Sequence, residues 1–240
     1  DAFGPRISWI FNTHNNFFEE VAKYRALRRM WAKIMRERLG AQDPRSWALR
    51  THTQTGGSTL TAQQPLNNIV RAAYQALAGV LGGVQSMALS CYDEALSIPT
   101  EEAQRIALRT QQILAHETGT TDTVDPLAGS YYVEHMTNEL EREALGYMER
   151  IDDMGGALSA LEQGYQMREI HESAVKHQRE VEGDERIVVG VNRYDSPTPP
   201  IASLQTIDPA ETRKQLDRLA RVRRERDSAS VQATLRRLRD

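Results

Sequence analysis

Arg50-Thr51-His52-Thr53-Gln54-Thr55-Gly56-Gly57 is the stretch that decides the predicted fold. Threonine alternates with His52 and Gln54 in the period-two pattern of a strand, but the side chains on both faces are polar, unlike those of an ordinary core strand. The two glycines can adopt backbone angles closed to other residues and let a ligand approach the main chain, and Pro65 signals the start of a helix. A strand that leads through such a turn into a helix is typical of the C-terminal mouth of an α/β barrel.

Similar strand–helix units lie on either side of this stretch. Residues 6–11 predict a strand, and residues 17–39 predict a helix from their apolar spacing. Residues 84–89 predict a third strand, which leads to a helix that begins at Glu101 with Thr100 as its cap. Strands that alternate with single helices imply a parallel sheet, because each crossover must return to the same end.

We therefore predict an α/β fold in which residues 1–100 form the C-terminal portion of a (β/α)8 TIM barrel. Such a piece would have an unpaired edge strand and an apolar inner face, so we expect a partner that closes the barrel. Residues 101–194 predict a mainly helical extension, and residues 195–240 predict a proline-containing linker and a charged helical tail. Within the extension we expect helices at 101–117, 133–154 and 166–182 and a short apolar strand at 186–192. Within the tail we expect Asp208 to cap a helix that starts at Pro209, and we expect two short helices over the charge-dense residues 213–240.

The composition excludes several classes of protein. The 240 residues are 40% hydrophobic, which is enough for a substantial core. The 30 basic and 33 acidic residues nearly cancel, so bulk charge predicts neither nucleic acid nor an anionic membrane as a partner. The one cysteine, Cys91, excludes an internal disulfide and a multi-cysteine zinc site and favours a reducing compartment. Since no apolar run could span a bilayer, we expect a soluble, cytoplasmic protein.

Three polar features have two interpretations each. The helix predicted at 17–39 has a basic face that could hold a phosphate-bearing ligand or be solvated. His52 could bond a ligand from a mouth-directed strand or be a satisfied structural histidine. Cys91 could be a nucleophile, although no paired base is visible, or a small buried residue. The other histidines show no ligand spacing with acidic residues, so no metal site is predicted.

Residues 5–194 resemble the C-terminal third of the substrate barrel, with the helical extension after it, of the methylmalonyl-CoA mutase family of adenosylcobalamin-dependent acyl-CoA mutases. The resemblance rests on the order and spacing of short segments. They are Pro5-Arg6-Ile7-Ser8, Asn15-Asn16-Phe17-Phe18-Glu19-Glu20-Val21-Ala22-Lys23, Arg50 to Thr55, Leu60-Thr61-Ala62-Gln63, Asn67-Asn68-Ile69-Val70-Arg71, Gly83-Val84-Gln85-Ser86, Asp93-Glu94-Ala95, Asp125-Pro126 and Val189-Gly190-Val191-Asn192.

The resemblance implies a coenzyme A site. In relatives, the positions of Arg6 and Ser8 line the passage of the coenzyme A chain. Similar candidates are Arg45, Arg50, Gln54, Gln85 and Ser86. Coenzyme A carries phosphates and pantetheine amides, which suit guanidinium, amide and hydroxyl partners. From spacing alone, Arg6 and Arg50 could instead be salt-bridged arginines at strand ends.

The resemblance also implies a cofactor site, because the positions of Gly57, Glu94 and Ser97 lie beside the cobalamin or its adenosyl group in relatives. A flat macrocycle needs backbone without a side chain at Gly57, and a carboxylate at Glu94 can accept two ribose hydroxyls. Without the resemblance, Glu94 would be interpreted as a residue near a helix start.

The sequence departs from the family at two places. Ser58 stands where relatives commonly have an aromatic residue, and Met87-Ala88-Leu89-Ser90-Cys91 stands where they commonly read Leu-His-Thr-Asn-Ser. Both changes remove bulk or polarity near the cofactor. The acyl group is therefore left open among methylmalonyl, isobutyryl, hydroxyisobutyryl and ethylmalonyl.

The function implied by the resemblance is a radical rearrangement of a branched acyl-CoA with adenosylcobalamin as cofactor. The family's substrate arginine and its catalytic tyrosine and histidine belong to barrel strands outside this sequence, and its Asp-x-His-x-x-Gly cobalamin motif does not occur here. We therefore expect a chain or segment that supplies the N-terminal barrel strands, together with a cobalamin-binding subunit or domain. The alternative is a noncatalytic assembly or chaperone-like barrel subunit, which the altered residues 87–91 favour. A natural split subunit and a fragment both fit the sequence.

Overall fold

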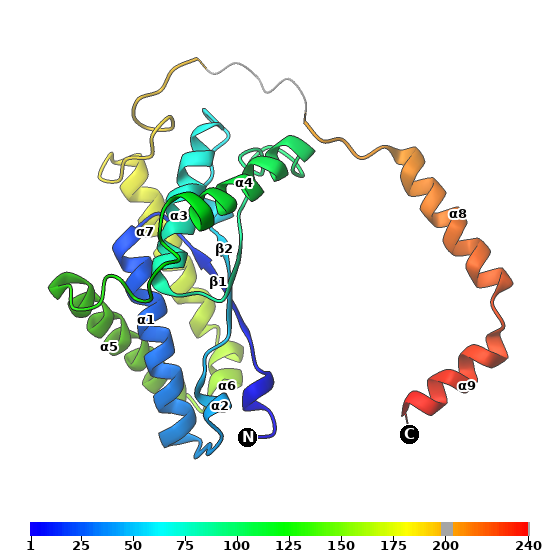
Figure 1. The fold of residues 1–240 in the computed structure, drawn as a ribbon, viewed down its shortest axis with the longest axis horizontal. Coiled ribbons are helices and arrows are strands. Elements are labelled where there is room, and N and C mark those ends of the chain that lie inside the picture. The colour runs from blue at the N-terminus through cyan, green and yellow to red at the C-terminus, as the bar shows by residue number, and fades with distance from the viewer. Residues whose placement is uncertain (198–203, 240) are drawn as a thin grey trace. The chain divides into compact units, whose positions relative to one another are not determined.

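The computed structural model describes residues 1–197 and 204–239 (Figure 1). They fall into two units, Asp1–Leu204 and Gln205–Asp240. The first unit contains a parallel sheet formed by β1 (Trp9–Thr13), β2 (Thr51–Thr55) and β3 (Ser86–Ala88), with β2 in the centre. The predicted α/β class and parallel sheet are confirmed, whereas the eight-stranded barrel stays a prediction.

Each crossover between strands contains the predicted helix. α1 (Phe17–Lys33) follows β1, and α3 (Asn67–Gly82) connects β2 to β3. The short elements are the 3-10 turns η1 (Gly4–Arg6) and η3 (Gly57–Thr59), the π-helical turn η2 (Ile34–Arg38) and the helix α2 (Pro44–Trp47). The first strand begins at Trp9 rather than at the predicted Arg6, because Pro5 lies in η1, where its fixed φ suits a helical turn.

Small side chains bring α3 close to the sheet. Ala72 is buried, and a Cβ added at Gly79 would lie 3.3 Å from Met87 Cε and 3.5 Å from Thr53 Cγ2. The larger Val70 is 54% exposed. The helix therefore packs through its small residues, and its backbone lies near the strands.

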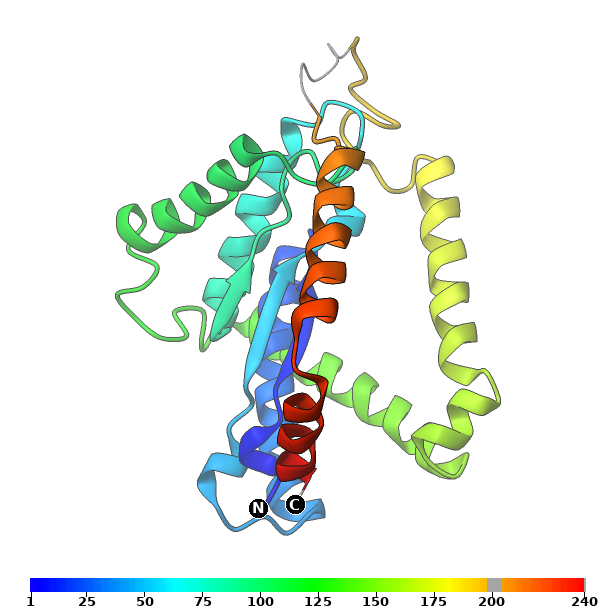
Figure 2. The same cartoon turned by 90° about the vertical axis from the view of Figure 1, so that its right-hand side faces the viewer.

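The extension after the sheet is helical, as predicted. It consists of α4 (Glu101–Glu117), α5 (Tyr131–Asp153), α6 (Ala157–Glu162) and α7 (Tyr165–Glu182). Thr100 Oγ1 accepts a hydrogen bond from Ala103 N at 3.3 Å and caps α4 as expected. α6 was not predicted, because a short helix between glycines shows little periodicity. No residue of α7 is buried, and Figure 2 shows this helix standing apart from the sheet.

The strand predicted at 186–192 is wrong. Val189 and Arg193 form only an isolated bridge in a loop. The Asn192 side chain takes over the local hydrogen bonds: its Oδ1 accepts from Val188 N at 2.7 Å, and its Nδ2 donates to the carbonyl of Arg186 at 2.8 Å. Asparagine often competes with regular structure in this way, so the apolar residues here form a loop.

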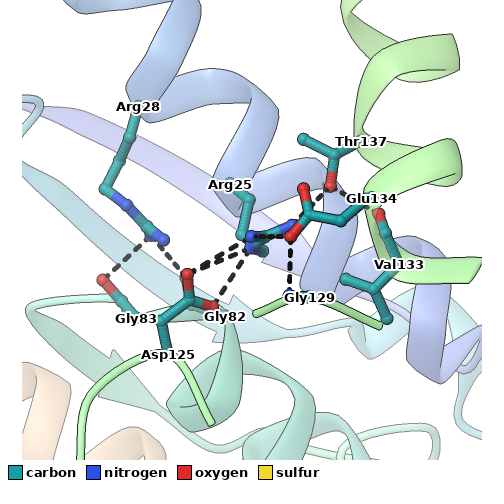
Figure 3. Close-up of polar contacts among 9 residues, drawn as sticks. All are labelled: Arg25, Arg28, Gly82, Gly83, Asp125, Gly129, Val133, Glu134 and Thr137. Carbon is teal, nitrogen blue, oxygen red and sulfur yellow. Dashed lines mark hydrogen bonds and ion pairs between the residues drawn. The ribbon is translucent and has the colours of Figure 1, made fainter. Parts of the chain in front are cut away.

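The basic face of α1 is paired with acidic residues (Figure 3). Figure 3 shows Arg25 against Asp125 and Glu134. Arg29 contacts Glu141 on α5. Arg25 also donates to Thr137 Oγ1 at 3.0 Å. In the middle of α1, neither sequence-based alternative holds, since these arginines join two helices instead of meeting solvent or a phosphate.

The second unit consists of α8 (Pro209–Glu225) and α9 (Ser228–Arg239), which confirms two helices in the tail. Asp208 caps α8 by accepting from Ala210 N at 2.8 Å. The apolar residues Leu216 and Val222 of α8 are exposed. Residues 198–200 of the predicted linker lie outside the described residues. Across 1–197 and 204–239, no helix is both long and apolar enough to cross a membrane.

Candidate functional site

The two faces of the sheet have different surroundings. α1 and α3 pack against the face that carries the odd-numbered strand residues, which include Phe11, Thr53 and Met87. The even-numbered residues form the opposite face, which we call the open face. The strand register aligns Ile10 with His52 and Ser86, and Asn12 with Gln54 and Ala88.

The open face is polar, so the expected apolar inner face is wrong. Asn12, Gln54 and Ser86 are exposed, and His52 is half-buried. Ile10 is the large apolar side chain on this face, with 76% of its surface exposed. A polar face suits contact with a polar ligand better than contact with a hydrophobic core.

On the covered face, the threonines of β2 are buried and hydrogen-bonded. Thr53 Oγ1 lies 2.7 Å from Thr13 Oγ1 and 2.6 Å from Tyr24 Oη, and these three hydroxyls form a closed set of bonds. Burial raises the pKa of Tyr24, against the opposing effect of its threonine partners. Thr55 Oγ1 accepts from Ser90 N at 2.7 Å. The polar residues of this face therefore stabilise the sheet, because each buried hydroxyl has a partner.

At the N-terminal end of the sheet, three of the predicted residues, His52, Gln85 and Ser86, make contacts between β2 and the start of β3. His52 Nδ1 lies 2.9 Å from Ser86 Oγ. Gln85 Oε1 accepts from Thr51 Oγ1 at 2.8 Å and from the backbone N–H of Thr51. Ser86 fixes the imidazole ring, and Gln85 joins the starts of the two strands.

The predicted arginines also lie at the N-terminal end of the sheet, because they precede their strands. Arg45 pairs with Asp43 at 2.7 Å, and this hydrogen bond raises its pKa. Arg50 donates to the carbonyl of Pro5. Arg6 and Ser8 are exposed, and their side chains have no hydrogen-bond or ion-pair partner within residues 1–197 and 204–239. Among the described residues, neither Arg6 nor Arg50 forms the salt bridge of the alternative interpretation.

The predicted cofactor residues lie beyond the C-terminal end of the strands. Glu94 Oε2 accepts from Cys91 N at 3.2 Å, and Glu94 Oε1 lies 3.4 Å from Ser90 Oγ. Gln54 reaches the same cluster, since its Nε2 donates to Ser90 Oγ at 3.3 Å. A Cβ added at Gly57 would lie 2.9 Å from Glu94 Oε1.

Ser97 is not part of this cluster. Its hydroxyl donates to the carbonyl of Ile98 at 3.0 Å, and no contact within the described segments joins it to Gly57 or Glu94. Apart from Ser97, the predicted residues therefore form two groups, one at each end of a short sheet, and Gln54, which was predicted for coenzyme A, lies with the cofactor residues.

One of the two reasons predicted for the glycines, backbone angles closed to other residues, does not hold. Neither Gly56 nor Gly57 has a positive φ, so neither backbone conformation requires glycine. Gly56 lacks room for a side chain, whereas a side chain at Gly57 would have to displace the flexible end of Glu94. A Cβ at Gly56 would lie 2.8 Å from His14 Cδ2, and a Cβ at Gly57 would meet Glu94.

Cys91 is a buried packing residue, as one of the two interpretations held. It is 7% exposed and packs with Tyr92 and Ala103. Burial, followed by the charges of Asp93 and Glu94, raises the pKa of the thiol to about 11. A thiol with this pKa is protonated at neutral pH and is therefore a poor nucleophile.

Sequence reasoning missed Gln75, Asn15 and Thr59, which surround the turn after β2. Gln75 is 1% exposed, and its Oε1 accepts from Gly56 N at 3.0 Å. A glutamine flanked by the buried Ala72 and Ala76 on one helix was the available signal, because a polar residue on a buried helix stripe needs a specific partner.

Two other features do not form part of the site. Within residues 1–197 and 204–239, no group of three His, Cys, Asp or Glu side chains is placed to hold a metal ion. A cavity of about 490 Å³ lies along α7, lined by His171, Lys176, Arg179 and their neighbours. None of the predicted site residues lines it.

Comparison with known proteins identifies the family. The methylmalonyl-CoA mutase family profile matches residues 1–240. The chain is 45% identical to the 2-hydroxyisobutanoyl-CoA mutase large subunit of Aquincola tertiaricarbonis, over 98% of this chain and 42% of that protein. It is 45% identical to the methylmalonyl-CoA mutase of Rhizobium meliloti, over 100% of this chain and 34% of that protein.

A third relative, the methylmalonyl-CoA mutase of Escherichia coli, is 42% identical over 98% of this chain and 33% of its own length. The chain thus spans about a third to two fifths of the length of these relatives. The profile match covers every residue, and the identities exceed 40% along nearly the whole sequence. The chain belongs to the methylmalonyl-CoA mutase family.

Proposed function

We propose that this chain is part of the substrate barrel of an adenosylcobalamin-dependent acyl-CoA mutase, which converts a branched acyl-CoA into its linear isomer. The observation that carries the proposal is the polar open face, which runs from an arginine-bearing end to the Gly57–Glu94 end. β2 has 5 residues. At about 3.3 Å per residue, the two ends are roughly 16 Å apart. A long ligand can lie along such a face with its nucleotide at one end and its reacting group at the other.

The N-terminal end suits coenzyme A. Arg6 offers an exposed guanidinium for a phosphate, and Ser8 offers a hydroxyl beside it. Gln85 uses its Oε1 to hold Thr51, which leaves its Nε2 as a donor for a pantetheine carbonyl. Arg50, fixed by the Pro5 carbonyl, adds positive charge to the same end.

The acyl group would lie near His52 and Gln54. If Ser86 Oγ donates to His52 Nδ1, the ring proton is on Nε2, and that N–H can donate to a thioester carbonyl. The role of these residues is then to orient the thioester, while the closed barrel keeps water away from the reacting group.

The C-terminal end fits the cofactor. Gly57 has no side chain, so a flat ring could approach its backbone closely, with the carboxylate of Glu94 beside it. The exposed carboxylate of Glu94 can accept hydrogen bonds from two ribose hydroxyls. Ser97, which lies apart from Glu94 here, would contribute from the loop before α4. When bound, adenosylcobalamin would supply the radical chemistry of the rearrangement.

The altered segment 87–91 supports a change of substrate more than a loss of activity. Leu89 and Cys91 are buried packing residues, so their differences from the family pattern lie in the core, whereas Ser90 is buried beside Gln54 and Glu94. Ala88 is on the open face, paired in register with Gln54, where its small side chain leaves room for an acyl group. The noncatalytic alternative therefore has no support from this segment.

The proposal includes the rest of the barrel. Residues 1–100 would form its last strand–helix units, with the outer edges of β1 and β3 joined to strands from the N-terminal part of the mutase. Residues 101–194 would be the helical extension, and residues 195–240 would be the linker and tail. A cobalamin-binding subunit or domain, an acyl-CoA substrate and a cytoplasmic location complete the proposal.

The test uses the full-length protein purified from its source together with its bound chains. Methylmalonyl-, isobutyryl-, 2-hydroxyisobutyryl- and ethylmalonyl-CoA are each incubated with adenosylcobalamin, and the isomers are separated by chromatography. We expect one branched substrate to be converted to a linear product only when the cofactor is present. Cofactor binding without turnover of any substrate would favour the assembly subunit, and absence of both coenzyme A and cofactor binding would refute the proposal.

A further inference from the structure

Gln75 lies on α3 with only 1% of its surface exposed, beside the turn that carries Gly56 and Gly57. Burying an amide is unfavourable unless its polar atoms are bonded. Gln75 Oε1 accepts from Gly56 N at 3.0 Å, and Gln75 Nε2 donates to Thr59 Oγ1 at 2.7 Å and to Asn15 Oδ1. One amide therefore joins the segment after β1, the end of β2 and the turn η3.

The Thr59 hydroxyl determines which way this amide points. Its one proton is donated to the carbonyl of Gly56, 2.6 Å away, so Thr59 Oγ1 acts as an acceptor toward Gln75. Gln75 Nε2 must then face Thr59, and Oε1 must face the N–H of Gly56. Neither a carboxylate nor a hydrocarbon side chain can make this set of bonds.

The Gly56 peptide is fixed from several directions. Its N–H also donates to Thr13 O at 2.8 Å, and its carbonyl accepts from Thr59 N at 2.9 Å. The ring of His14 lies 2.8 Å from the place where a Cβ would be. Gly57 follows directly in the chain, so its position relative to Glu94 depends on where the Gly56 peptide is held.

We propose that Gln75 is a positioning residue that sets the turn 56–59 for the cofactor without touching the cofactor itself. The inference rests on the proposed function, in which Gly57 and Glu94 bind adenosylcobalamin. Gln75 is buried among its partners, so its influence must pass through the turn. The coenzyme A residues lie at the opposite end of the sheet and should be insensitive to it.

The experiment uses the full-length protein in its natural assembly. Gln75→Met removes the three hydrogen bonds and keeps a long side chain, and Gln75→Glu keeps the acceptor for Gly56 but loses the donors. Gln178→Met, on the exposed α7, is the matched control. Two quantities are measured: hydrogen exchange of the amides in residues 56–61, and the dissociation constants of adenosylcobalamin and of coenzyme A.

We expect Gln75→Met to speed exchange in residues 56–61 and to weaken adenosylcobalamin binding about tenfold or more, as the loss of several hydrogen bonds implies. Coenzyme A binding should change less than about twofold, since roughly 16 Å of strand separates the two ends. Gln75→Glu should fall between Gln75→Met and the wild type. Gln178→Met should match the wild type in every measurement.

A second variant covers the case in which Gln75→Met fails to fold. Thr59→Val breaks the same contact from the half-buried turn and should shift cofactor binding in the same direction. Unchanged exchange and unchanged cofactor affinity would overturn the inference, as would equal losses for cofactor and coenzyme A. A wild-type protein that binds coenzyme A but no adenosylcobalamin would overturn the proposed cofactor site, and the exchange rates would then decide separately whether Gln75 holds the turn.

Discussion

The two faces of β2 are both polar, but their side chains have different environments: those on the covered face are buried and hydrogen-bonded, and those on the open face are accessible to a ligand. On the covered face, Thr53 is 1% exposed and bonded to Thr13 and Tyr24. On the open face, His52 and Gln54 reach only neighbouring residues of β3 and the loop after it. Alternating side chains of a strand point to opposite faces, so the same five residues serve both faces.

This difference shows that polarity alone does not identify a binding residue. A buried hydroxyl with partners contributes to stability, whereas an exposed polar side chain next to another strand is available to a ligand. Substitutions on the covered face should therefore change the free energy of unfolding, and those on the open face or at its ends should change ligand affinity.

The largest effect is expected where the open face meets the cofactor. Gly57→Val should abolish adenosylcobalamin binding, with a loss of more than about a hundredfold, because the branched side chain would occupy the space that the flat ring needs and would displace Glu94, whose Oε1 lies 2.9 Å from an added Cβ. The φ of Gly57 is not positive, so the variant should fold. Titration of the cofactor into the assembled enzyme measures the effect.

The control for Gly57→Val is Gly146→Ala on α5, where an added Cβ meets nothing within 4 Å. This change should leave cofactor binding unaltered, and it should slightly stabilise the helix. Normal turnover by Gly57→Val would show that the cofactor lies elsewhere and that the open face has another ligand.

The second effect concerns the opposite end of the open face. Arg6→Ala should weaken coenzyme A binding by roughly ten- to a hundredfold, the loss expected for one charge-assisted hydrogen bond. The melting temperature should not change, because Arg6 is exposed and has no side-chain partner in the described residues. Arg105→Ala on α4 is the control, and calorimetry with coenzyme A is the measurement. Equal affinity for Arg6→Ala would remove Arg6 from the site.

The third effect tests the covered face directly. Thr53→Val should lower the free energy of unfolding by about 1–2 kcal/mol, because it leaves two buried hydroxyls with fewer partners. Ligand affinity should remain as in the wild type. Gln54→Met, at the neighbouring position on the open face, should change the free energy of unfolding by no more than about 0.5 kcal/mol but should weaken ligand binding. Urea unfolding and ligand titration measure the two effects. If Thr53→Val and Gln54→Met changed stability and ligand affinity to the same extent, the two faces of β2 would not have different roles.

The elements of the fold could largely be predicted from local patterns. The cap at Thr100 and the strand at 51–55 depend on signals within a few residues, and both are confirmed. The strand at 186–192 was wrong because Asn192 satisfies the backbone of its own loop, a competition that apolar content does not reveal.

The site could be predicted less well, because its geometry depends on residues distant in the sequence. Special backbone angles were one reason predicted for Gly57, yet its φ is not positive, and the structure instead places Glu94 beside it. Arg25 was assigned to solvent or phosphate, and it instead meets Asp125 and Glu134, about a hundred residues later. No local pattern predicts such contacts.

The smallest expected effect concerns the contact between α1 and α5, where ion pairs take the place of the hydroxyl groups that bond on the covered face of the sheet. The side-chain hydrogen bond from Arg25, together with the backbone N–H of Gly129, lowers the pKa of Glu134 to about 2 from its usual 4.5 (Figure 3). A carboxyl group whose folded pKa is depressed contributes stability above the unfolded pKa and loses it as the pH falls through the folded pKa. The contribution of Glu134 should therefore be complete above about pH 4.5 and should disappear as the pH approaches about 2.

Glu134→Gln should accordingly lower the urea midpoint above about pH 4.5, and the difference from the wild type should shrink as the pH falls toward about 2. The effect should be small and should decrease with added salt, because Glu134 is partly exposed and Arg25 keeps Asp125 and Thr137 as partners. Glu117→Gln, at the exposed end of α4, should show no such pH dependence. A constant difference between wild type and Glu134→Gln across this pH range would show that charge pairing does not hold α5 against α1, and the helix contact would then depend on apolar packing around Val21 and Val133.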